Sequence, residues 1–178
     1  MSVDVELVAR IAAIAAEFDW TWSEEDTGRF SAAAGWHVTE RRPGSGATMR
    51  TTLPIEFPFA FAHVTGDLKN ITLGVSDKVD ATDLAGQTAL FERFRHLGRG
   101  VKDQLGDARI EVLTQGFGLR FRWSTPKVVV DLMAYPQAGI SLRLTNPEYD
   151  AWMQAVTAGH DDVEWVWGQE TEMPSAQP

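Results

Sequence analysis

The chain has 178 residues, which is long enough for one well-buried core and short for two. Its composition, 44% hydrophobic and 23% charged, is typical of a globular domain, and the lack of cysteine excludes disulfides, thiol catalysis and thiolate metal sites. The net charge of −9 is unevenly spread: it is −5 over residues 1–35, +3 over 36–146 and −7 over 147–178. Acidic ends disfavour nonspecific binding to nucleic acid and favour a basic partner, although solubility alone accounts for the same charge.

No segment has the pattern of a targeting or membrane-spanning sequence. The longest apolar run near the N-terminus, residues 11–16, is too short for the core of a signal peptide and is flanked by acids. No apolar stretch approaches the roughly 20 residues that a membrane-spanning helix needs. We therefore expect a cytoplasmic protein without membrane contacts.

The first 36 residues predict two helices joined at an aromatic corner. Apolar residues at helical spacing indicate a first helix over about residues 4–18. A tryptophan-rich segment follows, and Ser23 is expected to cap a second, short helix. Trp20 and Trp22 share one side of this extended segment, because alternate residues lie on the same face. We expect these two rings and Trp36 to be buried together between the first helix and a sheet that starts at Trp36.

Two blocks of alternating apolar and polar residues each predict four short strands. The first block covers residues 36–75, with turns at 43–46 and 67–70 and an inward-facing set that includes Phe57, Phe59 and Phe61. The second covers residues 110–144, where short turns indicate an antiparallel meander with one wet face. The wet face is expected to carry seven charged residues: Arg109, Glu111, Arg120, Arg122, Lys127, Asp131 and Arg143.

The order of these elements predicts an α+β fold. A helix over residues 82–105 separates the strand blocks, with Gly98 and Gly100 marking either a break or a close contact, and a last helix covers 147–158. The order αα-ββββ-α-ββββ-α is a pseudo-repeat in layout, with one long or two stacked antiparallel sheets and helices covering one face. We expect a single globular domain over residues 1–159, followed by an acidic aromatic segment and flexible tail over 160–178.

The sequence contains no recognisable catalytic or cofactor motif. Its four histidines lack the spacing of metal ligands, and no P-loop, His-Glu-x-x-His or Gly-x-Ser-x-Gly sequence occurs. His160 with Asp161, Asp162 and Glu164 is a weak metal-site candidate, because adjacent acids near a terminus are usually just solvated. We therefore expect no cofactor, no metal site and no catalytic residue.

Basic residues form one cluster in the sequence. The long helix carries four of them on one face, and two arginines of the second strand block are expected to join them: Arg93, Arg95, Arg99, Lys102, Arg120 and Arg122. Such a cluster suits phosphate or RNA. Interleaved acids favour the other reading, which is pairing within the molecule and with its acidic ends.

Acids at both ends of the chain and two tryptophans form the predicted partner-binding set. The two tryptophans lie among acids near the C-terminus and share a face if the segment is extended. They either bury on the domain as an edge strand or flap, or anchor a partner, since Trp is enriched at binding hot spots. The set is Glu24, Glu25, Asp26, Asp161, Asp162, Glu164, Trp165 and Trp167.

The segment Phe18-Asp19-Trp20-Thr21-Trp22-Ser23, followed by a short helix ending at Gly35-Trp36 and then by strand-rich sequence, resembles a family of small uncharacterised bacterial proteins. The likeness is sharp over residues 18–36 and looser through about residue 152. Members of that family are often encoded beside secreted polymorphic toxins and are candidate immunity proteins. The resemblance carries no catalytic residues, and it implies a protein-binding role.

These observations together predict a non-enzymatic protein-binding module. The favoured version is an immunity-type inhibitor whose acidic surface masks a basic toxin domain. One alternative is a secretion chaperone or adaptor, which would use exposed apolar surface and sheet edges more than charge. Another is an enzyme or small-ligand-binding protein with an aromatic pocket between Phe57, Phe59, Phe61 and the tryptophans.

Overall fold

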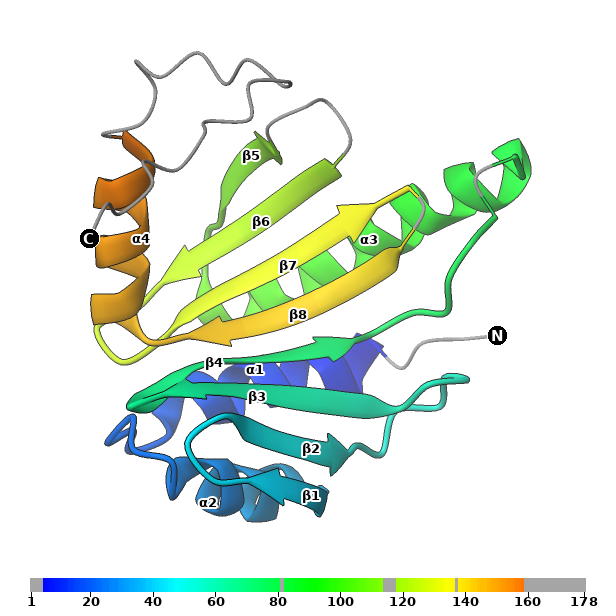
Figure 1. Cartoon of the computed structure of the whole chain (residues 1–178). Coiled ribbons are helices and arrows are strands. Elements are labelled where there is room, and N and C mark those ends of the chain that lie inside the picture. The colour runs from blue at the N-terminus through cyan, green and yellow to red at the C-terminus, as the bar shows by residue number, and fades with distance from the viewer. Residues whose placement is uncertain (1–4, 81, 114–117, 137, 159–178) are drawn as a thin grey trace, which may run out of the picture.

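The computed structural model describes residues 5–80, 82–113, 118–136 and 138–158, which form one eight-stranded antiparallel sheet and four helices (Figure 1). This confirms the predicted α+β class and element order, and it answers the open question of one sheet or two. The elements are α1 (Val5–Glu17), α2 (Asp26–Ala34), β1 (His37–Arg42), β2 (Gly46–Arg50), β3 (Phe59–Thr65), β4 (Asp67–Gly74), α3 (Leu84–Leu105), β5 (Arg109–Leu113), β6 (Gly118–Ser124), β7 (Val129–Tyr135), β8 (Gly139–Thr145) and α4 (Pro147–Ala158).

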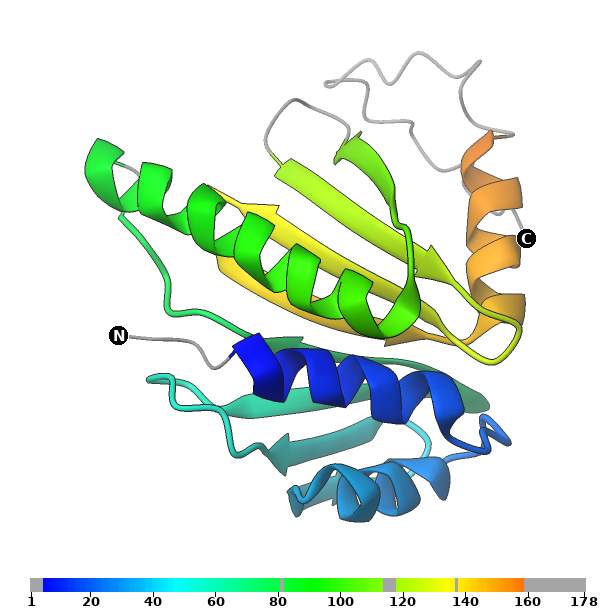
Figure 2. The same cartoon turned by 180° about the vertical axis from the view of Figure 1, so that it is seen from behind.

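The sheet consists of two four-stranded meanders joined edge to edge. Its strand order is β1-β2-β3-β4-β8-β7-β6-β5, so the last strand of each block pairs with the last strand of the other. Five residue pairs join β4 to β8, from Asn70 with Thr145 to Gly74 with Ser141. Helix α1 of the first half and helix α3 of the second lie on the same face of the sheet, and the two helices pack side by side (Figure 2). The two halves therefore share one layout.

The core lies between the sheet and the pair of helices α1 and α3. Helix α3 buries Leu90, Phe94, Leu97 and Val101, which are apolar residues at helical spacing, while Leu105 is only partly buried. In α1 two of the apolar residues at helical spacing, Leu7 and Ile14, are also only partly buried. The fully buried positions of α1 are Val8, Ala9, Ile11, Ala12 and Ala15.

The two glycines of α3 mark close contacts and not a break, since the helix is continuous from Leu84 to Leu105. A Cβ atom on Gly98 would lie 2.6 Å from the ring of Phe121 in β6. One on Gly100 would lie 2.7 Å from the side chain of Val5 in α1. Glycine thus lets α3 approach both the sheet and α1 more closely than any other residue would.

The prediction that Phe57, Phe59 and Phe61 face the core is wrong. The alternate residues Ala60 and Ala62 are buried instead. Neighbouring residues of a strand point to opposite faces, so the pairing register decides which set turns inward. The partners of the two alanines in β4 are completely buried, which fixes the alanines as the inner set.

Two local boundaries also differ from the prediction. The chain reverses at Gly66, whose φ of +74° favours glycine, and β4 already begins at Asp67 where a turn was expected. Ser23 does not cap α2, because the helix begins only at Asp26, after a turn in which the Asp26 N–H donates to the Ser23 carbonyl at 3.1 Å. The predicted terminal segment, residues 160–178, lies outside the described residues.

Asp26 organises the corner between α1 and α2. Its side chain is completely buried, and its Oδ2 accepts from the N–H groups of Thr21 and Trp22, both at 2.7 Å. Its other oxygen pairs with Arg29. These bonds fix Trp22 at a φ of +58°, in the left-handed region that only glycine adopts without strain.

The tryptophans of the corner pack together as expected, but two of them are less buried than expected. Trp36 is buried, whereas Trp20 and Trp22 are partly buried against the core. The rings of Trp20 and Trp22 stack with centroids 4.4 Å apart, and Phe30 lies between Trp20 and Trp36 in the same cluster. The Trp22 indole donates to the Lys127 carbonyl at 3.2 Å. The corner therefore joins α1 and α2 to the sheet.

Candidate functional site

One face of the sheet is covered by α1 and α3, and the opposite face, which we call the open face, displays the alternate residues of every strand (Figures 1 and 2). Helix α4 lies at one end of the open face, where its Asp150 accepts from Arg122 at 2.9 Å. The pairing register traces one row of residues across all eight strands: Glu40, Thr48, Phe61, Thr72, Arg143, Asp131, Arg122 and Arg109. This row of the open face therefore consists of charged, hydroxyl and aromatic side chains, of which Asp131 is buried.

Alternating charges form a chain of ion pairs over β5, β6, β7 and α4. We call it the ion-pair chain, and its members in order are Arg109, Glu111, Arg120, Asp131, Arg122 and Asp150. The successive nitrogen–oxygen distances are 3.1, 2.9, 3.8, 2.7 and 2.9 Å. The structure thus places these charged residues of the second block on one face as predicted, but the face is less exposed than expected, because Asp131 is buried and Arg122 is mostly covered. The predicted joining of Arg120 and Arg122 to the basic face of α3 is wrong, because these side chains lie on the opposite side of the sheet.

The ion-pair chain shifts the protonation of two of its members. Burial works to raise the pKa of Glu111, but the hydrogen bond and charge of Arg120, helped by Arg109 and Arg122, outweigh it and lower the pKa below its ordinary value. Hydrogen bonding to Asp131 raises the pKa of Arg122, the nearby carboxylates add to this, and burial opposes it. Both groups are therefore charged at neutral pH and act as fixed charges.

Three phenylalanine rings gather on the other half of the open face, and we call them the aromatic patch (Phe57, Phe59 and Phe61). The centroid of the Phe57 ring lies 4.8 Å from that of Phe59 and 6.4 Å from that of Phe61. Phe57 is 63% exposed and Phe61 46%. No ring contact among the described residues joins the patch to the tryptophans of the corner, so the described residues do not form the pocket expected between the two groups.

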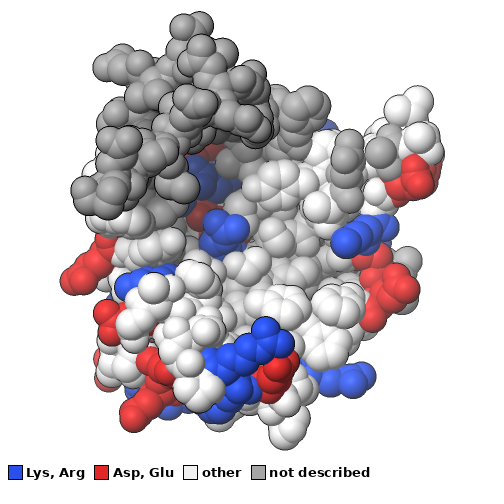
Figure 3. All heavy atoms as spheres, in the orientation of Figure 1, with Lys and Arg blue, Asp and Glu red and all other residues white. Residues whose placement is uncertain are grey.

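Two arginines flank the aromatic patch. Arg50 is the cross-strand partner of Phe59, and Thr72 separates Arg143 from Phe61 in the row described above. Within the described part of the chain neither guanidinium makes a hydrogen bond or an ion pair. Figure 3 shows this face, with uncharged surface between separate groups of charged side chains. The patch therefore has a positively charged border.

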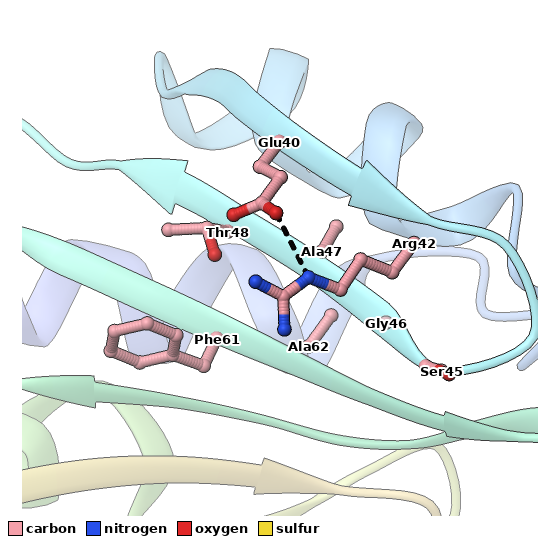
Figure 4. A pocket seen from close by; sticks show the side chains of 8 residues that line it. All are labelled: Glu40, Arg42, Ser45, Gly46, Ala47, Thr48, Phe61 and Ala62. Atoms are coloured by element: carbon pink, nitrogen blue, oxygen red, sulfur yellow. Dashed lines mark hydrogen bonds and ion pairs between the residues drawn. The ribbon is translucent and has the colours of Figure 1, made fainter.

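A shallow hollow of about 370 Å³ opens beside the patch over β1, β2 and β3 (Figure 4). Arg42 reaches across β2 toward Phe61, and its Nε donates to Glu40 at 2.8 Å. Thr48 and Ser45 add hydroxyl groups to its lining. The hollow offers an aromatic side, one ion pair and hydrogen-bonding groups to a bound side chain.

A second hollow, of about 490 Å³, lies between α4 and the strands β3 and β4. Trp152 of α4 is 56% exposed and stacks on Tyr149 with ring centroids 5.8 Å apart. Lys69 lies over the Tyr149 ring, and His63 lines the opposite side. Phe61 and His63 are alternate residues of β3, so the two hollows adjoin along the same strand.

The structure separates the members of the predicted partner-binding set. Glu24 is half-buried and accepts from the Gly44 N–H at 3.2 Å, while Glu25 is exposed just before α2. Asp26 is completely buried with both oxygens bonded, so it cannot act as a surface charge and leaves the set. Five members lie outside the described residues: Asp161, Asp162, Glu164, Trp165 and Trp167.

Sequence reasoning missed the aromatic patch as a surface. Ala60, Ala62 and Val64 form an equally regular alternation of apolar residues in the same stretch, so alternation alone contains no signal for which set faces outward. Of the described residues, no three His, Asp or Glu side chains lie together as metal ligands. No described helix combines the length and apolar character required to cross a membrane.

Comparison with known proteins identifies the family but not the activity. The model of a family of unknown function, DUF6301, matches residues 6–146. The chain belongs to this family. The match runs from α1 through β8 and includes both strand blocks of the open face. Neither the curated proteins nor the solved structures include a significant match to the chain. The function must therefore be argued from the surface itself.

Proposed function

We propose that this chain is a non-enzymatic protein-binding module that captures its partner on the open face of the sheet. The observation that carries the proposal is the aromatic patch, whose clustered rings include Phe57 at 63% and Phe61 at 46% exposure. Contiguous exposed apolar side chains rimmed by polar groups mark interaction sites. Aromatic residues and arginine supply most binding hot spots, and Arg50 and Arg143 border the patch.

The finer version of the proposal is an immunity-type inhibitor of a secreted toxin. It draws on the family resemblance of residues 18–36 and on the acidic ends of the chain. Glu24 and Glu25, together with the acids near the C-terminus, would steer a basic toxin domain toward the protein. We expect this role in the cytoplasm, where the toxin would act.

The test uses the protein encoded beside this one as the candidate partner. Titration calorimetry compares the unchanged chain with F57S and F61S, and with L84S as a matched control. Leu84 is also highly exposed, at 80%, but it lies at the start of α3 on the other side of the sheet. Each patch variant should weaken binding by about 10- to 100-fold, the range of hot-spot residues, while L84S should bind normally. Equal affinity of the patch variants and the unchanged chain would overturn the proposal.

A secretion chaperone or adaptor is the second candidate. The observation that favours it is the edge strand β5, where Ile110 and Val112 are 66% and 73% exposed. An inhibitor binds the folded toxin domain and abolishes its activity, and co-expression restores growth of cells that make the toxin. A chaperone instead binds an unfolded segment of its substrate and leaves the activity of the folded domain unchanged.

A further inference from the structure

A groove separates α3 from the edge strand β5, on the helix side of the sheet and away from the open face. Its volume is about 360 Å³, and it is lined chiefly by apolar groups at its base, including Ile110 and Phe121. The Phe121 ring stacks on Phe94 of α3 with centroids 4.6 Å apart, and Gly98 lets the helix close onto that ring. The base of the groove is therefore rigid and apolar.

The strand that borders the groove has one unpaired side. β5 is the last strand of the sheet, and no described strand pairs with its outer edge. Ile110 pairs with Phe121, so it faces α3, and Val112 faces the same way two residues later. Both side chains are mostly exposed. Edge strands of folded proteins are normally protected by charge, proline or a covering segment, and β-branched residues on a bare edge favour the addition of another strand.

The helix side of the groove is positively charged. Arg95, Arg99 and Lys102 are spaced four and three residues apart, so they project from the same side of α3. Lys102 pairs with Asp107, whereas Arg95 and Arg99 are exposed and make no hydrogen bond or ion pair within the described part of the chain. Two guanidinium groups thus lie beside an apolar base without a partner among the described residues.

We infer that the groove between α3 and β5 binds an extended acidic segment of a protein partner, which adds to β5 as a ninth strand. Backbone hydrogen bonds to the free edge would align the segment about 4.8 Å from β5. Its apolar side chains would cover Ile110 and Val112, and its acids would pair with Arg95 and Arg99. This second interface is separate from the open face, so a partner on one leaves the other available.

The experiment uses the full chain and a synthetic probe. The probe is a fluorescein-labelled nine-residue peptide in which valine and glutamate take turns at every second position, with threonine between them, so that valine and glutamate lie on the same face of the strand. Its neutral counterpart carries glutamine in place of glutamate. Fluorescence anisotropy compares the unchanged chain with the double variant R95E and R99E. R10E is the matched control, because Arg10 on α1 is also an exposed arginine that makes no hydrogen bond or ion pair with the residues that the structure describes.

The acidic peptide should bind the unchanged chain, and the double charge reversal should weaken binding by at least about tenfold. R10E should stay within about twofold of the unchanged chain. Bound peptide should also slow amide hydrogen exchange across Arg109–Leu113, a readout that a shift in overall charge would not produce.

Four results would overturn the inference. One is equal affinity for the acidic and neutral peptides, and another is a double variant that binds like R10E. A dimer in sedimentation that is lost in I110S would assign the edge to a second copy of the chain. Tight peptide binding only after removal of residues 159–178 would assign the groove to the chain's own C-terminal segment.

Discussion

Replacing Asp26 by asparagine changes a carboxylate into an amide of the same shape at a completely buried position. One oxygen, Oδ2, accepts from the N–H groups of Thr21 and Trp22 at 2.7 Å and from the Thr21 hydroxyl at 3.1 Å, while the other pairs with Arg29. An asparagine keeps its oxygen toward the backbone only by turning its NH₂ group toward the Arg29 guanidinium, so that two donors face each other. The variant therefore loses the ion pair and the charge that strengthens the remaining bonds.

We expect D26N to lower the free energy of unfolding by about 2–3 kcal/mol, since a hydrogen bond to a charged group contributes about 1.5–3 kcal/mol. D26A should cost about 4 kcal/mol, because it removes the acceptor of two partly buried N–H groups and releases Trp22 from its left-handed conformation. Urea unfolding followed by tryptophan fluorescence and circular dichroism measures both.

Arg29 provides the control for this reasoning. Its side chain is 45% exposed, so the guanidinium can turn to water, and R29Q should cost no more than about 1 kcal/mol. A D26N variant within about 0.5 kcal/mol of the unchanged chain would refute the role given to the carboxylate, because surface substitutions lie in that range. A larger loss in R29Q than in D26N would show that the ion pair and not the backbone bonds fixes the corner.

Three further outcomes can be checked by denaturation. The pKa of Glu111 is lowered in the folded state. The stability that Glu111 contributes is therefore present above pH 4.5, its ordinary pKa, and is lost as the pH falls through the folded pKa. In E111Q the difference between the unfolding midpoints at pH 7 and pH 3 should shrink. G98A should destabilise by about 1–3 kcal/mol in urea, because its Cβ would overlap the Phe121 ring, and a gain in stability would show that the ring moves aside. F57S should change the free energy of unfolding by no more than about 0.5 kcal/mol, since Phe57 is 63% exposed, and a larger loss would show that its ring is part of the core.

For the second strand block, the sequence alone predicts the strands and which residues lie on each face of the sheet. Each strand there alternates regularly and is joined to the next by a short turn, so the pattern alone places residues such as Arg120 and Arg143 on one side. What alternation could not predict was the burial of Asp131, which is 2% exposed on the wet face. Asp131 pairs with Arg122, which also pairs with Asp150 of α4, and no local pattern contains such contacts between distant elements.

The aromatic residues of the first block were harder to place, for a physical reason. Phe59 and Phe61 alternate with Ala60 and Ala62, and both sets are apolar, so hydrophobicity does not distinguish the inner face from the outer. Pairing with the buried residues of β4 decides it, and that pairing is a tertiary fact. Asp26 is a similar case. A carboxylate three residues after a serine is typical of an exposed helix start, whereas here the carboxylate is buried and accepts hydrogen bonds from the backbone of the corner.

The charges of the open face also determine where binding energy can come from. In the ion-pair chain the three carboxylates already contact guanidinium groups and the six charges cancel, so a partner there would have to replace contacts that the fold makes itself. The rings of Phe57 and Phe61 in the aromatic patch are instead exposed and stack on each other. Arg50 and Arg143 border the patch and make no hydrogen bond or ion pair with the described residues. Affinity should therefore depend on the phenylalanines and its salt dependence on the charges around them, with Glu24 and Glu25 attracting a basic partner and the two arginines opposing it. One titration series at two salt concentrations separates the contributions.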